Sequence, residues 1–123
     1  MNKIIIHWTA GTYQPNTTDL EHYHFLIDGE GKKHNGKYKP EDNENCNDGK
    51  YAAHTGGGNT GAIGVSMCAM AGFNSAASCG NYPITPVQLE ACFKLCAELC
   101  KKYNIPVENV WTHYEFGINH PDT

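Results

Sequence analysis

The sequence predicts a single domain of the α/β (α+β) class, in which a small β-sheet is covered by helices. Three observations lead to this prediction. Short apolar segments, typical of buried strands, recur along the chain. One longer segment near the C-terminal end has the apolar periodicity of an amphipathic helix. The length of 123 residues fits one hydrophobic core, because chains of this size seldom bury two.

Four short apolar segments are predicted to be strands: residues 3–7, 23–28, 62–70 and 107–111. A loop at residues 10–16 and a short helix at residues 17–22 separate the first two strands. Residues 32–51 are polar and rich in Asn and Gly, so we expect a long, mobile excursion there.

The clearest helix begins after Thr85, which caps its N-terminus. Pro86 takes the first helical position and Gln88 completes a capping box. Asn104 and Pro106 end the helix. Apolar residues at helical spacing predict its buried stripe, which consists of Leu89, Cys92, Phe93, Cys96, Leu99, Cys100 and Tyr103.

The six cysteines are 46, 68, 79, 92, 96 and 100. The N-terminus has an apolar run of only three residues, so it is not a signal peptide and synthesis in the cytoplasm is expected. Thiols there stay reduced. Cys92, Cys96 and Cys100 are a helical turn apart, too far for disulfides. They could bind a metal as thiolates, but we favour a role as small packing residues.

The net charge and the apolar segments argue against nucleic acid and membrane as partners. A formal net charge of −4 argues against nucleic acid, because neutralising phosphates requires an excess of Lys and Arg. No apolar segment approaches the length of a membrane span.

Two histidines stand at the ends of predicted strands. His7 closes the first strand and His113 follows the last one, so the two rings meet if these strands are neighbours. A catalytic zinc site uses three protein ligands and an open position for water, and neutral imidazole suits it. Spacing alone, however, favours core histidines bonded to backbone carbonyls.

Four segments add a resemblance: residues 5–10, residues 23–29, the segment from His54-Thr55 to Gly64-Val65, and residues 111–113. In this order they resemble the type 2 N-acetylmuramoyl-L-alanine amidases, which include phage lysozyme-type amidases, bacterial autolysins and peptidoglycan recognition proteins. The resemblance covers nearly the whole chain. It implies one amidase domain over residues 1–123, with a central mixed β-sheet flanked by helices and zinc in a groove at one edge.

The resemblance also implies roles for individual residues. His7 and His113 match the two zinc-binding histidines, and Tyr23 matches the tyrosine that stabilises the oxyanion. His54 matches a position where it contacts the oxyanion or the peptide stem of the substrate, although a loop histidine without a role would look the same. Thr9 is expected to orient His7 or to line the substrate site.

Two neighbouring features are interpreted as structural. His24 follows Tyr23 in the strand, so it should point to the opposite face of the sheet. Residues 56–60 are rich in glycine but lack the Lys-Ser/Thr of a phosphate-binding loop, and we interpret them as a wall of the substrate groove.

The third zinc ligand of the family, Cys or Asp, follows the second histidine and a lysine usually precedes it. Glu115 lies on the same short segment as His113 and is too close to reach the same ion. His120 and Asp122 stand at suitable separations. Either Asp122 substitutes, or the chain lacks a C-terminal segment that carries the ligand beyond Thr123, and we favour the second interpretation.

The expected function is zinc-dependent hydrolysis of the amide between N-acetylmuramic acid and L-alanine in peptidoglycan, by a monomer. Without its third ligand the chain should have low or no activity. The alternative is a non-catalytic module that binds peptidoglycan, and a domain whose histidines are merely packed is a third possibility. A hydrolase without a signal peptide resembles a phage or prophage endolysin, which reaches the cell wall after release by another protein.

Overall fold

Within residues 1–75, 78 and 80–119, which the computed structural model describes, five strands form one sheet in the order β3-β2-β4-β1-β5. The strands are β1 Lys3–Trp8, β2 Phe25–Ile27, β3 Lys33–Asn35, β4 Ala62–Met67 and β5 Val110–Thr112. Neighbouring strands are parallel except β2 and β3, which are antiparallel. The expected mixed sheet is therefore confirmed.

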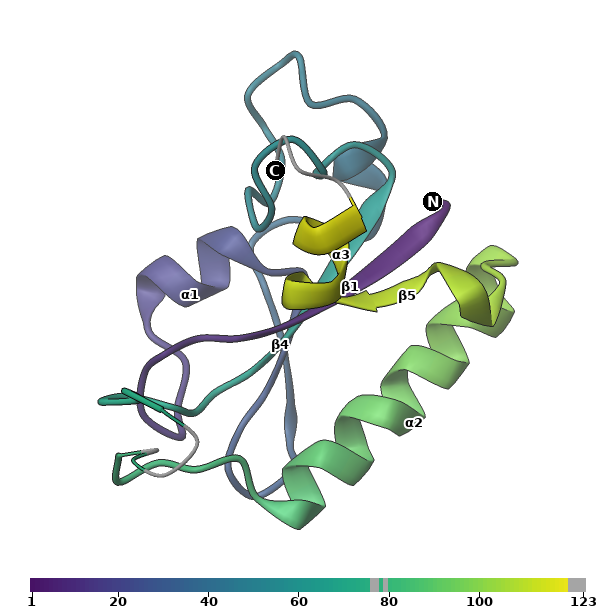
Figure 1. The fold of residues 1–123 in the computed structure, drawn as a ribbon. Coiled ribbons are helices and arrows are strands. Elements are labelled where there is room, and N and C mark those ends of the chain that lie inside the picture. Colours follow the sequence, from purple (N-terminus) through teal and green to yellow (C-terminus); the bar gives the residue numbers. More distant parts are fainter. Residues whose placement is uncertain (76–77, 79, 120–123) are drawn as a thin grey trace.

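The same described residues form three α-helices that flank the sheet: α1 Thr17–His22, α2 Pro86–Tyr103 and α3 His113–Asn119. Two short 3-10 helices are η1 Pro40–Glu44 and η2 Val107–Asn109. In Figure 1, α2 runs along one side of the strands and α1 lies on the other side, while α3 follows directly on β5. No helix in the described part of the chain is long and apolar enough to cross a membrane.

Helix α2 begins and ends as its sequence predicts. The Thr85 hydroxyl accepts a hydrogen bond from Gln88 N (3.1 Å), and Gln88 Oε1 accepts one from Thr85 N (3.1 Å). These two bonds satisfy groups that the first turn of a helix leaves unpaired. At the other end Asn104 adopts a left-handed conformation with φ 57°, which stops the helix.

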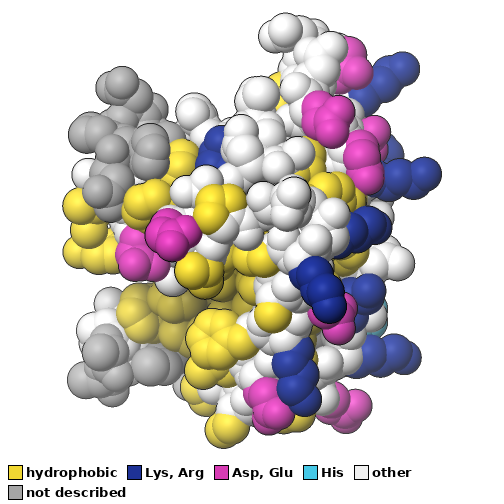
Figure 2. All heavy atoms as spheres, turned by 90° about the vertical axis from the view of Figure 1, so that its right-hand side faces the viewer, with side chains coloured by type: hydrophobic (Ala, Val, Ile, Leu, Met, Phe, Trp, Pro, Cys, Tyr) yellow, Lys and Arg dark blue, Asp and Glu magenta, His cyan; other side chains and the backbone are white. Residues whose placement is uncertain are grey.

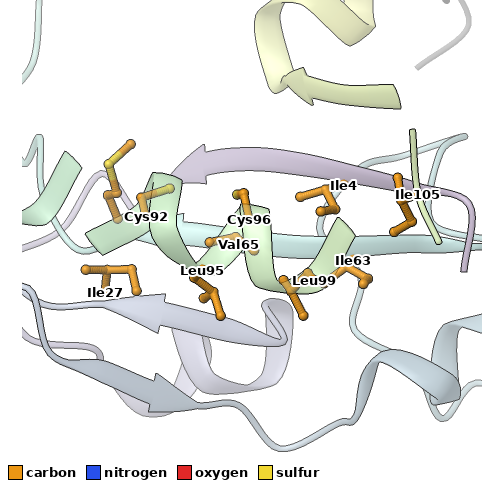
Figure 3. Close-up of a cluster of buried hydrophobic side chains, with 10 residues drawn as sticks. Ile4, Ile27, Ile63, Val65, Cys92, Leu95, Cys96, Leu99 and Ile105 are labelled. Atoms are coloured by element: carbon orange, nitrogen blue, oxygen red, sulfur yellow. The ribbon is translucent and has the colours of Figure 1, made fainter. Parts of the chain in front are cut away.

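The main core lies between α2 and one face of the sheet (Figure 3). Its buried members are Ile4, Ile27, Ile63, Val65 and Met67 from the strands and Cys92, Leu95, Cys96, Leu99 and Ile105 from α2 and its end. The free Cys92 and Cys96 thus pack as small apolar residues, as expected. Cys79 lies outside the described residues.

The predicted buried stripe of α2 was wrong on one flank. Leu89 is 38% exposed and Phe93 is 57% exposed, whereas Gln88 and Leu95 are buried. The face that meets the sheet is therefore rotated toward Gln88. The Gln88 amide can lie there because its Nε2 donates to the carbonyls of Ile27 and Cys68, both at 2.9 Å.

Residues 32–51 contain regular structure where we expected a mobile excursion. They form β3 and η1, and Asn43 within η1 is fully buried. Asn43 Nδ2 donates to the carbonyls of Ala52 and Asn59, and its Oδ1 accepts from Ala52 N and from the His24 ring. One side chain thus attaches the segment to the sheet and to the loop before β4.

Candidate active site

Four rings meet at the end of β1. The ring of His7 has its centroid 4.9 Å from that of His113, 5.1 Å from that of His54 and 5.2 Å from that of Tyr23. His7 and His113 converge because β1 and β5 are parallel neighbours, with Ile6 paired to Thr112. The convergence expected from the strand ends is therefore present.

Each of the other rings comes from a different element. His113 is the first residue of α3, directly after β5. Tyr23 is the C-cap of α1, two residues before β2, so the second strand begins two residues later than predicted. His54 comes from the loop that precedes β4 and is 8% exposed.

Hydrogen bonds tie His7 to His54 and Thr55. His7 Nε2 lies 3.1 Å from His54 Nδ1 and 3.3 Å from Thr55 Oγ1, and His54 Nδ1 lies 2.9 Å from Thr55 Oγ1. The backbone N–H groups of His54 and Thr55 both donate to Asn59 Oδ1, at 2.9 and 2.8 Å. The loop conformation that presents His54 is thus held by a side chain of the same loop.

Burial keeps these histidines uncharged. The pKa of His7 lies well below its ordinary value of 6.5, mainly because the ring is desolvated and further because of His54 and His113. Burial likewise lowers the pKa of His54 to about 3. Neutral imidazole is the form that binds zinc, so the electrostatics of the site suit a metal ligand.

Tyr23 stays protonated, because its pKa is raised above the ordinary value, mainly by burial of the phenol. The nearby buried Ser66 hydroxyl on β4 acts in the opposite direction and lowers this pKa, although the two groups form no hydrogen bond of ordinary geometry. Tyr23 can therefore act as a hydrogen-bond donor in the site.

The donor set fits two positions of a zinc site. His7 and His113 offer adjacent imidazoles, but no group of three His, Cys, Asp or Glu within the described residues could hold a metal ion. Glu115 is engaged elsewhere, since its Oε1 accepts from Thr112 N at 3.0 Å. The other candidates for the third ligand, His120 and Asp122, lie outside the described residues.

The rings open into a groove of about 770 Å³. Its apolar lining includes Trp8, Ile84, Tyr114 and Ile118, and Figure 2 shows a hollow with a mainly hydrophobic wall on this side of the molecule. Tyr114 and Ile118 of α3 were not among the site residues expected from the sequence. The spacing of Tyr114 and Ile118, four residues apart, is the signal that could have revealed a helix with one face toward the groove.

Thr9 is not brought into this groove. Its hydroxyl accepts hydrogen bonds from Gly11 N (3.1 Å) and Ala69 N (3.3 Å), and it is not among the described residues that line the groove. Its geometry is that of a residue that shapes the loop after β1.

The glycine-rich residues 56–60, which we expected to form a wall of the substrate groove, do not line the groove that contains the histidines. Gly57 and Gly58 line a second pocket of about 300 Å³ together with Lys3 and Trp111, rather than the groove that contains the histidines. His24, in contrast, has the structural role expected. Its ring is buried, bonded to Asn43 Oδ1 (2.9 Å) and accepts a hydrogen bond from Gly64 N (2.9 Å).

The sequence matches the family described as N-acetylmuramoyl-L-alanine amidase over residues 1–122. The chain belongs to this amidase family. No curated protein matches the chain.

Solved structures of amidases and recognition proteins share the amidase-family fold. The peptidoglycan recognition protein SD of Drosophila is 19% identical and superposes with a TM-score of 0.64, covering 93% of this chain and 69% of its own. The amidase LysC from Clostridium intestinale is also 19% identical, with a TM-score of 0.61 and coverage of 92% and 70%.

A third similar structure is the N-acetylmuramyl-L-alanine amidase AmiD from E. coli, solved with the substrate anhydro-N-acetylmuramic acid-L-Ala-D-γ-Glu-L-Lys. It is 22% identical, has a TM-score of 0.63, and the match covers 92% of this chain and 48% of AmiD. At these identities the similarity establishes the fold of the amidase family, and the chemistry of the present site has to be argued from its own residues.

Proposed function

We propose that this amidase-family domain hydrolyses the amide between N-acetylmuramic acid and L-alanine in peptidoglycan, with His7 and His113 as ligands of a zinc ion. The adjacency of these two imidazoles beside a protonated tyrosine in an apolar groove supports the proposal. The third ligand would follow α3, where His120 and Asp122 are candidates.

Zinc, when bound, would polarise the amide carbonyl and activate water for attack. Side chains of the protein would hold the metal ion and stabilise the charge that develops on the substrate oxygen. His7 and His113, whose ring centroids lie 4.9 Å apart, would hold the metal ion, and the Tyr23 hydroxyl would donate a hydrogen bond to an oxygen that gains negative charge. Such a donor stabilises the transition state more than the ground state.

The groove suits a substrate with apolar and polar parts. Trp8 is 43% exposed and Tyr114 is 79% exposed, and exposed aromatic faces bind the apolar faces of sugars and peptides while their edges remain in water. A muropeptide stem is such a ligand. The substrate in the AmiD structure belongs to this class, which supports peptidoglycan as the partner of this domain.

The second candidate is recognition of peptidoglycan without hydrolysis. Two observations favour it: no three-donor metal group occurs within the described residues, and the fold is shared with a peptidoglycan recognition protein. The same groove would bind the same ligand, but no bond would be broken.

Calorimetric titration with zinc tests the metal site. We expect one-to-one binding that is lost in His113→Ala and retained in His22→Ala, a matched control because His22 is exposed and bonded to Ala53 O outside the groove. Binding unaffected by His113→Ala would refute the proposed ligand.

Release of stem peptides from purified cell walls, with and without a chelator, then separates the two candidates. Chelator-sensitive release supports the hydrolase, whereas wall binding without release supports the recognition module. In the hydrolase, Tyr23→Phe should keep zinc binding and lower kcat about 10²- to 10³-fold, the usual loss for one oxyanion donor.

A further inference from the structure

We infer that His54 and Thr55 are positioning residues that fix His7 in the tautomer protonated on Nε2 and leave its Nδ1 lone pair for the metal. This inference rests on the proposed function for the identity of the metal. It gives His54 a role other than the substrate contact expected from the sequence.

The position of one proton follows from the carbonyl of Ala62. His54 Nε2 lies 3.4 Å from Ala62 O in hydrogen-bonding geometry. A carbonyl oxygen only accepts, so Nε2 carries the proton. A neutral imidazole has one N–H, and none of the hydrogen-bond partners of the His54 ring among the described residues is a carboxylate that would hold the ring charged. His54 Nδ1 is therefore an acceptor.

The proton on His7 follows from the proton on His54. His7 Nε2 faces His54 Nδ1 at 3.1 Å, and two lone pairs at this distance would repel each other. His7 Nε2 must therefore carry a proton and donate it, either to His54 Nδ1 or to Thr55 Oγ1 at 3.3 Å. A histidine that binds a metal ion is neutral and has a single N–H, so the Nδ1 of His7 has the lone pair. No hydrogen bond to a described residue engages His7 Nδ1.

His54 and Thr55, which form the hydrogen-bond relay to His7, are themselves held in place by neighbouring groups. Asn59 Oδ1 accepts from the backbone N–H groups of both His54 and Thr55. The ring of His54 also lies against Gly64, where a Cβ would come within 2.7 Å of two ring atoms. A histidine held on both sides can impose one tautomer on its neighbour, whereas a mobile one would exchange hydrogen bonds with water.

Histidine ligands of metals typically donate their second N–H to a protein acceptor, which fixes the ring and its tautomer. Loss of such an acceptor usually lowers metal affinity 10- to 100-fold. We therefore expect His54→Leu, which keeps apolar volume but offers no acceptor, to weaken zinc binding by about this factor. His54→Asn should stay within about threefold of the wild type, because Asn Oδ1 can occupy the position of the lost Nδ1.

The direct test is ¹⁵N NMR of the metal-free wild-type protein at neutral pH, in which imidazole nitrogen shifts report the tautomer. We expect the Nε2–H tautomer for both His7 and His54, and Nδ1–H on His7 would overturn the inference. This measurement needs neither a variant nor zinc.

The variants then test the consequence for the metal, once urea unfolding has shown that each one folds. Weaker zinc binding in His54→Leu, with recovery in His54→Asn, supports the positioning role. Equal zinc affinity in all three proteins overturns it. A wild-type protein that binds no zinc refutes the proposed metal site, and the tautomer of His7 in the NMR spectrum still decides the hydrogen-bond relay separately.

Discussion

The imidazole of His54 lies directly against the backbone of Gly64 on β4. A Cβ built at Gly64 would approach His54 Cδ2 and Cγ to 2.7 Å, closer than real Cβ contacts allow. Glycine is required here by this close approach, and the space it leaves is what lets a loop histidine reach His7 on the neighbouring strand β1.

Gly64→Ala should therefore destabilise the fold by about 1–3 kcal/mol, the usual cost of overpacking, and shift the His54 ring. Urea unfolding measures the cost. Gly56→Ala is the matched control, because a Cβ there meets no atom within 4 Å. In the His54→Ala background the cost of Gly64→Ala should fall, since the clashing ring is gone. An equal cost in both backgrounds would contradict the steric argument.

The buried histidines predict a fall in stability with acid. Burial lowers the pKa of His24 to about 4 and that of His54 to about 3, against about 6.5 in the unfolded chain. Their contribution is complete above pH 6.5. As the pH falls below this value, the unfolded state takes up protons that the folded state does not, and stability decreases.

Each such histidine should reduce the free energy of unfolding by about 1.4 kcal/mol per pH unit between pH 6 and its folded pKa. Urea unfolding from pH 7.5 to 4.5 measures the slope. His24→Gln should make it shallower, because one titrating group is removed. A wild-type stability that is flat between pH 7 and pH 5 would show that these rings are not kept neutral in the fold.

The sequence was most informative where a local pattern determines the outcome. The capping box at Thr85 predicted the start of α2, and the apolar run before His7 predicted β1. The approach of His113 to His7 was also predictable in part, because parallel neighbours end at the same edge of a sheet. The pairing of β1 with β5 itself could not be read from either strand alone.

The features that could not be predicted are hydrogen bonds between residues far apart in the sequence. The contact between His54 and His7 could not be predicted, because nothing in the loop around His54 reveals that His7 Nε2, on β1, lies 3.1 Å from its Nδ1. The polarity of residues 32–51 suggested a mobile segment. The hydrogen bonds that order this segment were not visible in the sequence, because the partners of Asn43 include His24, far away along the chain. Polar residues are predicted to be exposed unless all their hydrogen bonds can be located, and only the fold locates them.

Asn43→Ala should consequently be one of the more damaging substitutions, although its segment looks like a loop. It removes a buried amide that makes four hydrogen bonds, and each buried partner left unpaired costs about 1–3 kcal/mol. We expect a loss of more than about 2 kcal/mol in urea unfolding. Asn47→Ala, at an exposed position of the same segment, should change stability by less than about 0.5 kcal/mol, and equal effects of the two would refute the anchoring role.

Gln88 offers the sharpest test of the core, because a single atom distinguishes it from glutamate. Its Nε2 donates to Ile27 O and Cys68 O while its Oε1 accepts from Thr85 N. Gln88→Glu keeps the acceptor but turns the donor into an oxygen that faces two carbonyl oxygens. We expect a loss of more than about 3 kcal/mol at pH 7, the order of cost for an unpaired buried charge.

The pH dependence of this loss identifies its cause. A buried, unpaired carboxyl has a raised pKa, so the penalty is largest above that pKa and decreases as the pH falls and the acid regains a proton that it can donate. The difference between variant and wild type should therefore be smaller at pH 5 than at pH 7 in urea unfolding, even though both proteins lose stability in acid. Glu98→Gln, the reverse change at an exposed position of α2, should have little effect at either pH. A penalty for Gln88→Glu that does not change with pH would mean that lost packing, rather than the unpaired charge, is responsible.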